Sequence, residues 1–279
     1  MPAAVKHFSA AAADPHTIHQ YLKADGVVIV EGATTRETID TILEEVGSVP
    51  DGQTFALAAK SATFATQLLM NPLYFDLTNR ILTDACIIYY EQERTVSISD
   101  PQVSQTSILC AEPNSLPWGL RRQDECHHIS HPAKREAQLG IMYAAHDLTR
   151  DNGAVRVVIG SNHWTDSRDP SPEDECLVEL RKGDALLWLG STYFGRAANA
   201  TDKDSVLLSA TATAGYRRQE ENQYLAVPWE VVERYPTPVQ RFLGYAVSRP
   251  YGGSVEHMEP LDFMKVKGDW SKYIPVDLI

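Results

Sequence analysis

Short apolar runs separated by turn residues make up the sequence from Ser104 to Thr213. Such runs are typical of buried strands, and turn clusters such as Asp151-Asn152-Gly153 are typical of the corners between antiparallel strands. Neither an alternation of strands and helices nor a glycine-rich phosphate loop is present. The pattern predicts a mainly β fold with flanking helices and a double-stranded β-helix core, the jelly-roll or cupin-like barrel. The predicted strands are Gln138–Ala144, Ala154–Val158, Cys176–Leu180, Ala185–Leu189 and Val206–Thr213.

The sequence before this region predicts helices around a single strand. Val27–Val30 is a short apolar run that is typical of a buried strand. Thr34 and Glu37 have the spacing of a helix capping box, and apolar residues then recur at the spacing of one helix face. Further helices are predicted at Pro15–Lys23, Ala59–Met70 and Pro72–Ala85, and after the β region near Trp229–Tyr235 and Pro238–Tyr245.

The chain is expected to form one domain that spans residues 1–279. Residues 1–100 are predicted to be its mainly helical part, residues 101–228 the β-helix core, and residues 229–279 the C-terminal helices and an irregular tail. A chain of this length can bury a sizeable core.

The charge balance restricts the partners. The chain has 25 Lys and Arg against 37 Asp and Glu, and a surface with a net charge of −12 repels nucleic acid and anionic membranes. No run approaches the roughly 20 apolar residues of a membrane helix, and no secretory or organelle signal is visible, so we expect a cytoplasmic location. The four cysteines form no CxxC pair and are expected to be reduced: Cys86, Cys110, Cys126 and Cys176.

Four segments carry recognisable motifs. Residues 24–29 read ADGVVI, residues 151–164 read DNGAVRVVIGSNHW, residues 183–192 read GDALLWLGST, and residues 218–228 read RQEENQYLAVP. In this order they resemble the phytanoyl-CoA dioxygenase family, and most closely its fungal branch that oxidises meroterpenoids and related natural products. The last segment matches the family signature nearly letter for letter, and the resemblance spans residues 20–250.

The resemblance implies a double-stranded β-helix that binds Fe(II) and 2-oxoglutarate. Iron is held in the family by a His-x-Asp pair on one strand and by a distal His on another. Two imidazoles and one carboxylate on one side of the metal leave positions open for the co-substrate and for O₂. An arginine pairs with the far carboxylate of 2-oxoglutarate, because its planar guanidinium matches a carboxylate.

The first metal motif of the family is altered in this chain. The family pattern is approximately LHRDD-x-x-HH, and residues 120–128 read LRRQDECHH. Arg121 stands where the first His belongs, and Gln123 stands where the carboxylate belongs.

The distal motif is altered as well. The family pattern is approximately GST-x-HGG-x-AN, and residues 190–199 read GSTYFGRAAN, so Phe194 occupies the position of the second His. Eleven residues further on, where the family carries the arginine for the co-substrate, this chain has Ser205.

These replacements remove the metal chemistry. Arg121 has no lone pair to donate and adds a positive charge, Gln123 lacks the anionic charge, and Phe194 has no coordinating atom. Ser205, which stands in place of the arginine that pairs with 2-oxoglutarate, cannot form that ion pair. We therefore expect that this chain binds neither Fe(II) nor 2-oxoglutarate and has no catalytic residue of its own, and that both groups are bound by a partner subunit.

Two arrangements of Arg121 are open at this stage. Its side chain could point into the former metal cavity and pair with Asp124 or Glu125, because an unpaired buried cation costs several kcal/mol. Alternatively the cavity is collapsed, with Phe194 filling the space and Arg121 turned to solvent.

A relocated metal site is a further alternative. It would use a cluster of potential ligands just after the altered motif, although residues so close in sequence alternate faces or lie on one loop. The cluster consists of Asp124, Glu125, His127, His128 and His131.

Three other histidines receive structural interpretations. The pair of His257 and Glu259 in the tail is predicted to lie on the surface, and His146 with Asp147 is predicted to be a solvated pair at a strand end. His163 matches a family position that shapes a turn of the barrel.

Three functions are consistent with the sequence. The first is a catalytically inactive accessory subunit that pairs with an active dioxygenase paralogue, as the resemblance implies for fungal pathways with paired subunits such as talaromyolide-type meroterpenoid biosynthesis. The second is a metal-free isomerase or cyclase that acts on a terpenoid in the inherited pocket. The third is an iron oxygenase with displaced ligands. The groups available for acid–base chemistry in the second are Arg121, Asp124, His127 and His146.

The first hypothesis also predicts a contact surface. A heterodimer of like folds keeps a nearly symmetric interface, and the terpenoid substrate would lie at or near it. The candidate interface or pocket residues are the polar run Arg218, Gln219, Glu220, Glu221, Asn222, Gln223 and Tyr224.

Overall fold

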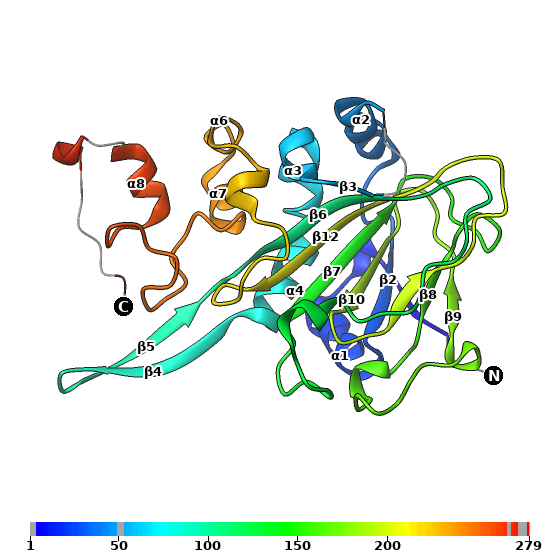
Figure 1. Ribbon diagram of the computed structural model, residues 1–279, viewed down its shortest axis with the longest axis horizontal. Helices are drawn as coiled ribbons and strands as arrows, with labels where there is room; N and C mark the ends of the chain where they lie inside the picture. Colours follow the sequence, from blue (N-terminus) through cyan, green and yellow to red (C-terminus); the bar gives the residue numbers. More distant parts are fainter. Residues whose placement is uncertain (1–3, 49–52, 267–268, 273–277, 279) are drawn as a thin grey trace.

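Two β-sheets face each other in the computed structural model, which describes residues 4–48, 53–266, 269–272 and 278 (Figure 1). The larger sheet has seven strands in the order β1-β2-β10-β7-β12-β6-β3, and the smaller has three in the order β11-β8-β9. Only the β1 and β2 pair is parallel among the pairs of the two sheets in the described residues. The strands are β1 (Lys6–Ser9), β2 (Val27–Glu31), β3 (Gln53–Phe55), β6 (Pro101–Ala111), β7 (Gln138–Ala144), β10 (Ala185–Leu189) and β12 (Ser205–Ala214), then β8 (Val155–Val157), β9 (Cys176–Val178) and β11 (Phe194–Arg196).

Helices pack on the face of the larger sheet that is turned away from the smaller one. Their buried side chains join those of the strands in one apolar cluster. A π-helical turn at Phe64–Leu68 contributes to the same cluster. The α-helices are α1 (Pro15–Asp25), α2 (Arg36–Val46), α3 (Leu57–Lys60), α4 (Pro72–Leu82), α5 (Gln223–Ala226), α6 (Trp229–Val232), α7 (Thr237–Phe242) and α8 (Pro260–Val266).

Strand β10 shows why the central strands are apolar throughout. Successive side chains of a strand point to opposite faces of its sheet. Leu187 and Leu189 belong to the cluster beneath the helices, whereas Leu186 and Trp188 belong to a second cluster between the two sheets. Both faces of β10 are therefore covered, and every residue of the strand is buried.

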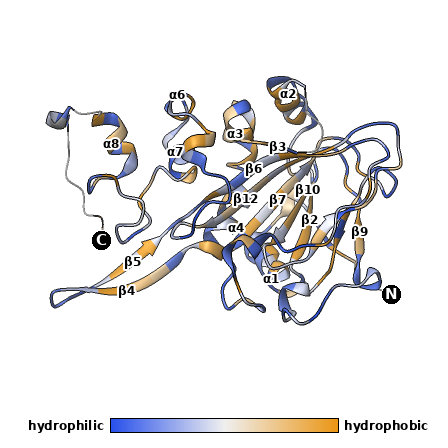
Figure 2. Ribbon diagram, in the orientation of Figure 1, coloured by the Kyte–Doolittle hydropathy of each residue, from blue (hydrophilic) through white to orange (hydrophobic). Residues whose placement is uncertain are grey.

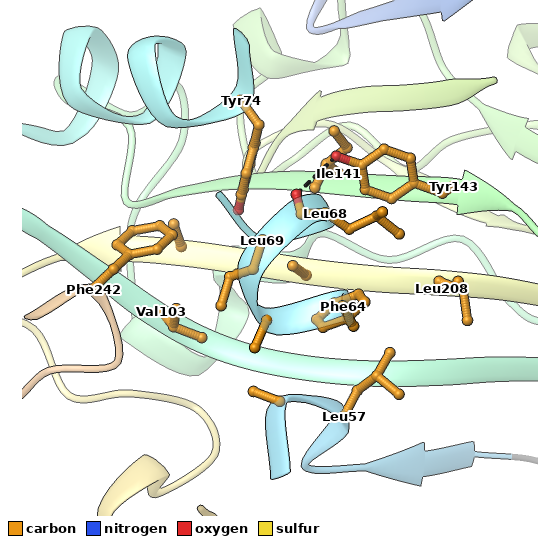
Figure 3. Close-up of a cluster of buried hydrophobic side chains, with 14 of the residues drawn as sticks. Leu57, Phe64, Leu68, Leu69, Tyr74, Val103, Ile141, Tyr143, Leu208 and Phe242 are labelled. Atoms are coloured by element: carbon orange, nitrogen blue, oxygen red, sulfur yellow. Dashed lines mark hydrogen bonds between the residues drawn. The ribbon is translucent and has the colours of Figure 1, made fainter. Parts of the chain in front are cut away.

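Figure 3 shows the cluster beneath the helices, where the π-helical turn lies across the sheet. Tyr143 from β7 is fully buried, and its hydroxyl donates a hydrogen bond of 3.0 Å to the carbonyl oxygen of Leu68. Tyr74 from α4 donates in the same way to the carbonyl oxygen of Leu139, at 3.2 Å. These bonds satisfy the two phenol groups and fix the turn and α4 on the sheet.

The predicted core strands are largely confirmed. β7 and β10 have the predicted bounds, and β8, β9 and β12 differ from the prediction by one or two residues at an end. Two strands of the barrel, β6 and β11, were not predicted. The mainly β class with flanking helices is correct.

The predicted helical character of residues 1–100 was wrong in part, because this region contributes strands β1 and β3 and a hairpin as well as β2. The hairpin consists of β4 (Asp84–Tyr90) and β5 (Glu93–Ser99). The helix predicted at Ala59–Met70 is divided into α3 and the π-helical turn, and the helix predicted at Pro72–Ala85 ends at Leu82 because β4 begins at Asp84.

Smaller corrections concern helix ends and the tail. The cap of α2 is Thr35, whose hydroxyl accepts from the backbone N–H of Thr38, rather than Thr34. His257 is exposed as predicted, but Glu259 is buried and accepts from the backbone N–H of Val247 at 2.8 Å. Part of the predicted tail, residues 267–268, 273–277 and 279, lies outside the described residues.

The four cysteines are free, as predicted. Among the described residues, we find no helix with the length and apolar character needed to cross a membrane.

Candidate functional site

The backbone brings the two altered motifs side by side. The loop after β6 runs back across β11, and Arg121 and Phe194 form an antiparallel bridge with N···O distances of 2.9 and 3.0 Å. Gly195 permits this approach, because a Cβ at that position would lie 2.9 Å from the carbonyl oxygen of Trp118. The positions that carry the two histidines in the family are therefore neighbours in this chain.

Phe194 fills the space between the sheets. Its side chain is 6% exposed, and its ring centroid lies 5.1 Å from that of Trp188. Trp188 itself lies directly against Gly140 of β7, where an added Cβ would come within 2.2 Å of the indole. Arg121 is exposed to solvent. Phe194 thus lies in the apolar cluster and Arg121 is turned to solvent, as in the second of the two predicted arrangements. The space beside them is not closed, because a cavity remains at the bridge.

Gln123 is held in a polar contact instead of being available as a ligand. Its side-chain amide donates to both carboxylate oxygens of Glu220, at 2.9 and 2.7 Å, and the residue is 7% exposed. The buried Gln138 donates to Ser104 at 3.0 Å and to Glu220 at 3.5 Å. A carboxylate at position 123 would face the carboxylate of Glu220, so the neutral amide suits this environment.

Ser205 is buried beside a residue that the sequence analysis did not single out. Arg196 from β11 is 2% exposed, and its guanidinium donates to the Ser205 hydroxyl at 2.7 Å and to the Ser205 carbonyl oxygen at 3.0 Å. It also donates to the carbonyl oxygens of Leu109 and Gly153, both at 3.1 Å. Burial lowers the pKa of Arg196 to about 10. Four of the five N–H donors of the guanidinium thus bond within its own chain.

A sequence signal for Arg196 existed. The family pattern has glycine at this position, and the serine that replaces the co-substrate arginine is the partner of its guanidinium. A loss of arginine at one position and a gain at another, nine residues before it, indicates that the two changes are related.

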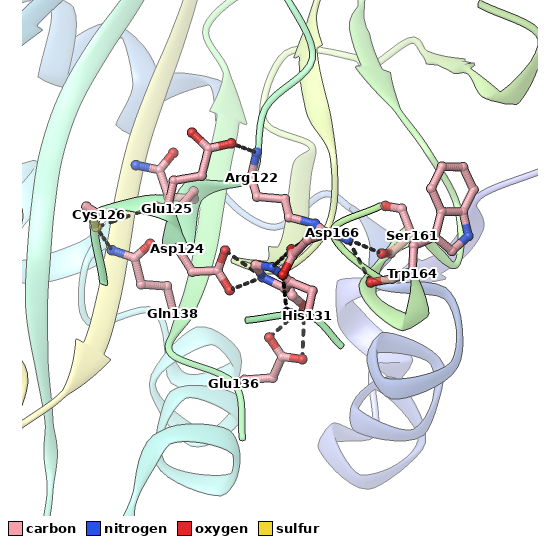
Figure 4. A network of polar contacts seen from close by, with 12 residues as sticks. Arg122, Asp124, Glu125, Cys126, His131, Glu136, Gln138, Ser161, Trp164 and Asp166 are labelled. Atoms are coloured by element: carbon pink, nitrogen blue, oxygen red, sulfur yellow. Dashed lines mark hydrogen bonds and ion pairs between the residues drawn. The ribbon is translucent and has the colours of Figure 1, made fainter. Parts of the chain in front are cut away.

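Figure 4 shows the polar network that the candidate metal ligands form instead. His131 contacts Asp124 through Nε2, at 3.1 Å, and Asp166 through Nδ1, at 2.7 Å. Arg122, which is 3% exposed, donates to Asp166 at 3.0 Å and to the carbonyl oxygens of Ser161 and Trp164 at 3.1 and 3.0 Å. Burial raises the pKa of Asp124, and its hydrogen bond with His131 opposes the rise. The network ties residues 121–131 to the loop at 161–166.

The other members of the ligand cluster point elsewhere. Glu125 accepts from the backbone N–H of Arg122 at 3.1 Å, and His128 is exposed. His127 contacts Thr213 at 3.2 Å, and burial lowers its pKa to about 4. Among the described residues, no three His, Cys, Asp or Glu side chains are arranged to hold a metal ion. The residues at the family positions do not fit iron either, since they are an exposed guanidinium, an engaged amide and a buried phenyl ring.

The four groups proposed for metal-free acid–base chemistry each have separate surroundings. Arg121 is exposed, Asp124 is paired with His131, and His127 contacts Thr213. His146 accepts from the backbone N–H of Val206 at 2.8 Å, so it serves the start of β12. No acid and base of this set share a contact. His163 contacts the carbonyl oxygen of Ala24 at 3.1 Å, which agrees with its predicted role in a turn.

The polar run at 218–224 alternates between exposed residues and residues that are buried or half-buried. Gln219 donates to the carbonyl oxygen of Leu243 at 2.9 Å, and Gln223 is fully buried and donates to Glu221 at 3.0 Å. Burial raises the pKa of Glu221. The remaining members of the run are exposed, and they are Arg218, Glu220, Asn222 and Tyr224.

A cavity of about 440 Å³ lies at the bridge between the two motifs. Its lining includes Gln53, Trp118 and Leu120 with Arg121 and Phe194. The cavity therefore has a phenyl ring and a guanidinium where the family has imidazoles.

The two facing sheets define a double-stranded β-helix, in which the two altered motifs lie side by side. The family model for phytanoyl-CoA dioxygenase (PhyH) matches residues 22–205. The chain belongs to this family.

Several fungal relatives match along most of the chain. Dioxygenase cnsJ of Penicillium expansum is 32% identical over 269 residues, which cover 88% of this chain and 81% of the relative. Dioxygenase himG of Aspergillus japonicus is 29% identical, over 95% of this chain and 92% of the relative.

Solved structures support the fold. The α-ketoglutarate-dependent carbocyclase SnoK of nogalamycin biosynthesis matches with a TM-score of 0.54 and 15% identity, over 81% of this chain and 93% of that one. The epimerase SnoN of the same biosynthesis matches with a TM-score of 0.53 and 18% identity, over 71% and 80%. These similarities confirm the predicted jelly-roll core.

Proposed function

We propose that this chain is a catalytically inactive accessory subunit that pairs with an active Fe(II)/2-oxoglutarate dioxygenase homologue in fungal natural-product biosynthesis, with a meroterpenoid as the substrate class. The observation that carries the proposal is the position of Phe194, which is packed on Trp188 in the apolar cluster where the family has a metal ligand. The fungal relatives cnsJ and himG are named dioxygenases, and the fold of the family is retained.

Loss of both anchors supports inactivity. Iron in this class needs three donors on one side of the metal. Here Arg121 has no lone pair to donate, and Gln123, whose amide nitrogen donates to Glu220, has only a neutral carbonyl oxygen in place of the carboxylate. The arginine that would pair with 2-oxoglutarate is replaced by Ser205, whose hydroxyl accepts from Arg196.

Retention of the surface supports pairing. The exposed residues of the run form a strip beside the altered motifs, since the Glu220 carboxylate accepts from Gln123. They are Arg218, Glu220, Asn222 and Tyr224. A partner of the same fold would contact this strip and hold the terpenoid in its own intact pocket near the interface.

Metal binding is the first test. Calorimetric titration of the purified chain with Fe(II) under anaerobic conditions, or with Mn(II) as a redox-silent substitute, should show no one-to-one binding at micromolar concentration. The same titration should show no binding of 2-oxoglutarate. Micromolar binding of the metal would contradict the proposal and support displaced ligands.

Pairing is tested with an intact-triad homologue from the same organism, co-expressed with this chain. The two should co-elute, and turnover by the homologue should fall at least tenfold when this chain is left out. Full activity of the homologue alone, without co-elution, would contradict the accessory role.

Restoration of the motif is the third test. The variant Arg121→His, Gln123→Asp, Phe194→His, Ser205→Arg replaces the altered positions by the family residues. We expect this fourfold variant to remain without 2-oxoglutarate binding, because the guanidinium of Arg196 already fills the space that the new arginine would need. The fivefold variant with Arg196→Gly removes this obstacle. Binding of 2-oxoglutarate by the fourfold variant would contradict this interpretation.

A further inference from the structure

The hairpin of β4 and β5 projects from the body of the protein as an arm (Figure 1). The two strands pair only with each other within the described residues, and each has seven residues. At about 3.4 Å per residue the arm extends roughly 24 Å. It is long enough to reach across the surface of another protein.

One face of the arm is apolar and exposed. Ile87 pairs with Val96, and Ile98 pairs with Ala85, so these side chains are neighbours on the same face with Tyr89. Their exposed fractions are 55% for Ile87, 70% for Tyr89, 50% for Val96 and 49% for Ile98. Figure 2 shows apolar colouring on β4 and on the part of β5 nearest the body, with polar colouring at the tip. A contiguous patch of this kind marks an interaction site.

The arm lacks the features that protect an exposed hairpin. Residues 85–90 read ACIIYY, with no charge, proline or glycine, and the residues 84–99 contain no lysine. Uncharged segments with this composition aggregate when they are left exposed, and edge strands usually carry lysine or proline against this. A lone two-stranded hairpin is also marginally stable in water. The face is therefore built to be covered.

We propose that the arm is a dimerisation element, in which two copies of this chain each lay the apolar face of the arm on the body of the other. A half-exposed large apolar side chain presents roughly 100 Å². The four side chains and Ala85 then bury about 450 Å² of accessible surface on each arm. With an equal area on the partner, each arm buries about 900 Å². One arm is below the roughly 1,200–2,000 Å² of a stable interface, whereas two reciprocal arms bury about 1,800 Å².

Charge distinguishes this occupant from a membrane. A net charge of −12 repels an anionic lipid surface, and the tip of the arm adds Glu91 and Glu93 against a single Arg94. The apolar face carries one charge, Arg94, which lies opposite Tyr89 at the tip. Between two acidic copies this cation meets a surface of opposite sign, and the remaining repulsion is screened beyond about 8 Å at physiological ionic strength. The inference does not require the proposed function, although a homologous subunit that replaced one copy would use the same face.

The mass of the isolated protein in solution tests the proposal. Sedimentation velocity at about 1–50 µM should give a species of twice the chain mass of 31.0 kDa. The variant Ile87→Lys, Tyr89→Lys should sediment as a monomer over this range, since lysine on the exposed face blocks the apolar contact. The control Leu116→Lys, at a side chain that is 83% exposed outside the arm, should remain a dimer.

A second variant guards against loss of folding. The variant Ile87→Thr, Tyr89→Thr keeps a strand-forming residue at both positions, so the monomer should stay folded and keep its melting temperature. Its dimer dissociation constant should be at least tenfold higher than that of the wild type. Amide hydrogen exchange in residues 84–99 should be slower in the wild type than in either variant. A monomeric wild type at 50 µM, or arm variants that remain dimeric, would overturn the proposal, whatever the outcome with a co-expressed homologue.

Discussion

The substitution Phe194→Ala measures whether the former metal position is part of the core. A buried aromatic side chain removes roughly 150–250 Å² from water, and Phe194 is 6% exposed. At about 25 cal/mol per Å² its burial contributes about 4–6 kcal/mol, of which alanine keeps about a quarter. The variant should therefore lower the free energy of unfolding by about 3–4 kcal/mol, which agrees with the range of about 3–5 kcal/mol for such truncations.

Urea unfolding followed by tryptophan fluorescence gives this free energy directly, and thermal melting gives a second measure. The melting temperature should fall by about 10 °C, since each kcal/mol is worth about 2–4 °C in a domain of this size. Leu116→Ala is the matched control, because that side chain is 83% exposed and its loss should change stability by less than about 0.5 kcal/mol. A loss below about 1 kcal/mol for Phe194→Ala would show that the ring contributes little to the core, and would refute the packing of Phe194 between the sheets.

Three further outcomes follow from the contacts around the site. Burial lowers the pKa of His127 to about 4, with Arg217 contributing, so the unfolded state binds the proton more strongly. The contribution of neutral His127 to the free energy of unfolding is therefore fully present above the ordinary histidine pKa of about 6.5. It falls by about 1–2 kcal/mol toward pH 4.5, allowing for the exposed part of the ring. In urea unfolding, His127→Gln should not show this loss. Gln123→Asp places a second carboxylate against that of Glu220. It should lower the free energy of unfolding by about 2 kcal/mol at pH 7 and by less at pH 4.5, as measured by urea unfolding. Arg122→Lys loses the forked hydrogen bonds of a buried guanidinium and should cost about 2–3 kcal/mol in thermal melting.

The sequence predicts the strands of the barrel well where both faces of a strand are buried. β10 is an uninterrupted apolar run with Gly and Asp before it and Gly and Ser after it, and β7 is apolar apart from Gln138 and Gly140, so both could be found directly. β11 has only three residues, Phe194, Gly195 and Arg196, and no apolar run at all. Its strand conformation is imposed by pairing with β8 and by the bridge to Arg121, which are contacts distant in sequence.

The arm and the site show two other limits. The apolar residues of β4 and β5 were assigned to a helix end or left unassigned, because no core periodicity marks a hairpin that projects from the fold. At the site, the absence of ligands at Arg121, Gln123 and Phe194 could be read from the motifs. The contacts that replaced them could not, because Glu220 reaches Gln123 across 97 residues of sequence, and only the fold brings them together.

Arg196 and Ser205 provide the last prediction, a double-mutant cycle. Arg196→Gly leaves the carbonyl oxygens of Leu109 and Gly153 and the Ser205 hydroxyl without their donor, and should cost about 3–5 kcal/mol. Ser205→Arg forces a second guanidinium against the first, and should cost at least about 3 kcal/mol, since like charges in a buried site repel strongly. In the double variant the new arginine enters from β12 the space that Arg196 has left, with the same acceptors within reach. The loss in free energy of unfolding of the double variant should be at least about 2 kcal/mol smaller than the sum of the losses of the two single variants. Urea unfolding of the wild type and the three variants measures these values. Costs that add to within about 0.5 kcal/mol would show that the two guanidinium groups do not compete for one place, and the exchange of arginine between the strands would then be wrong.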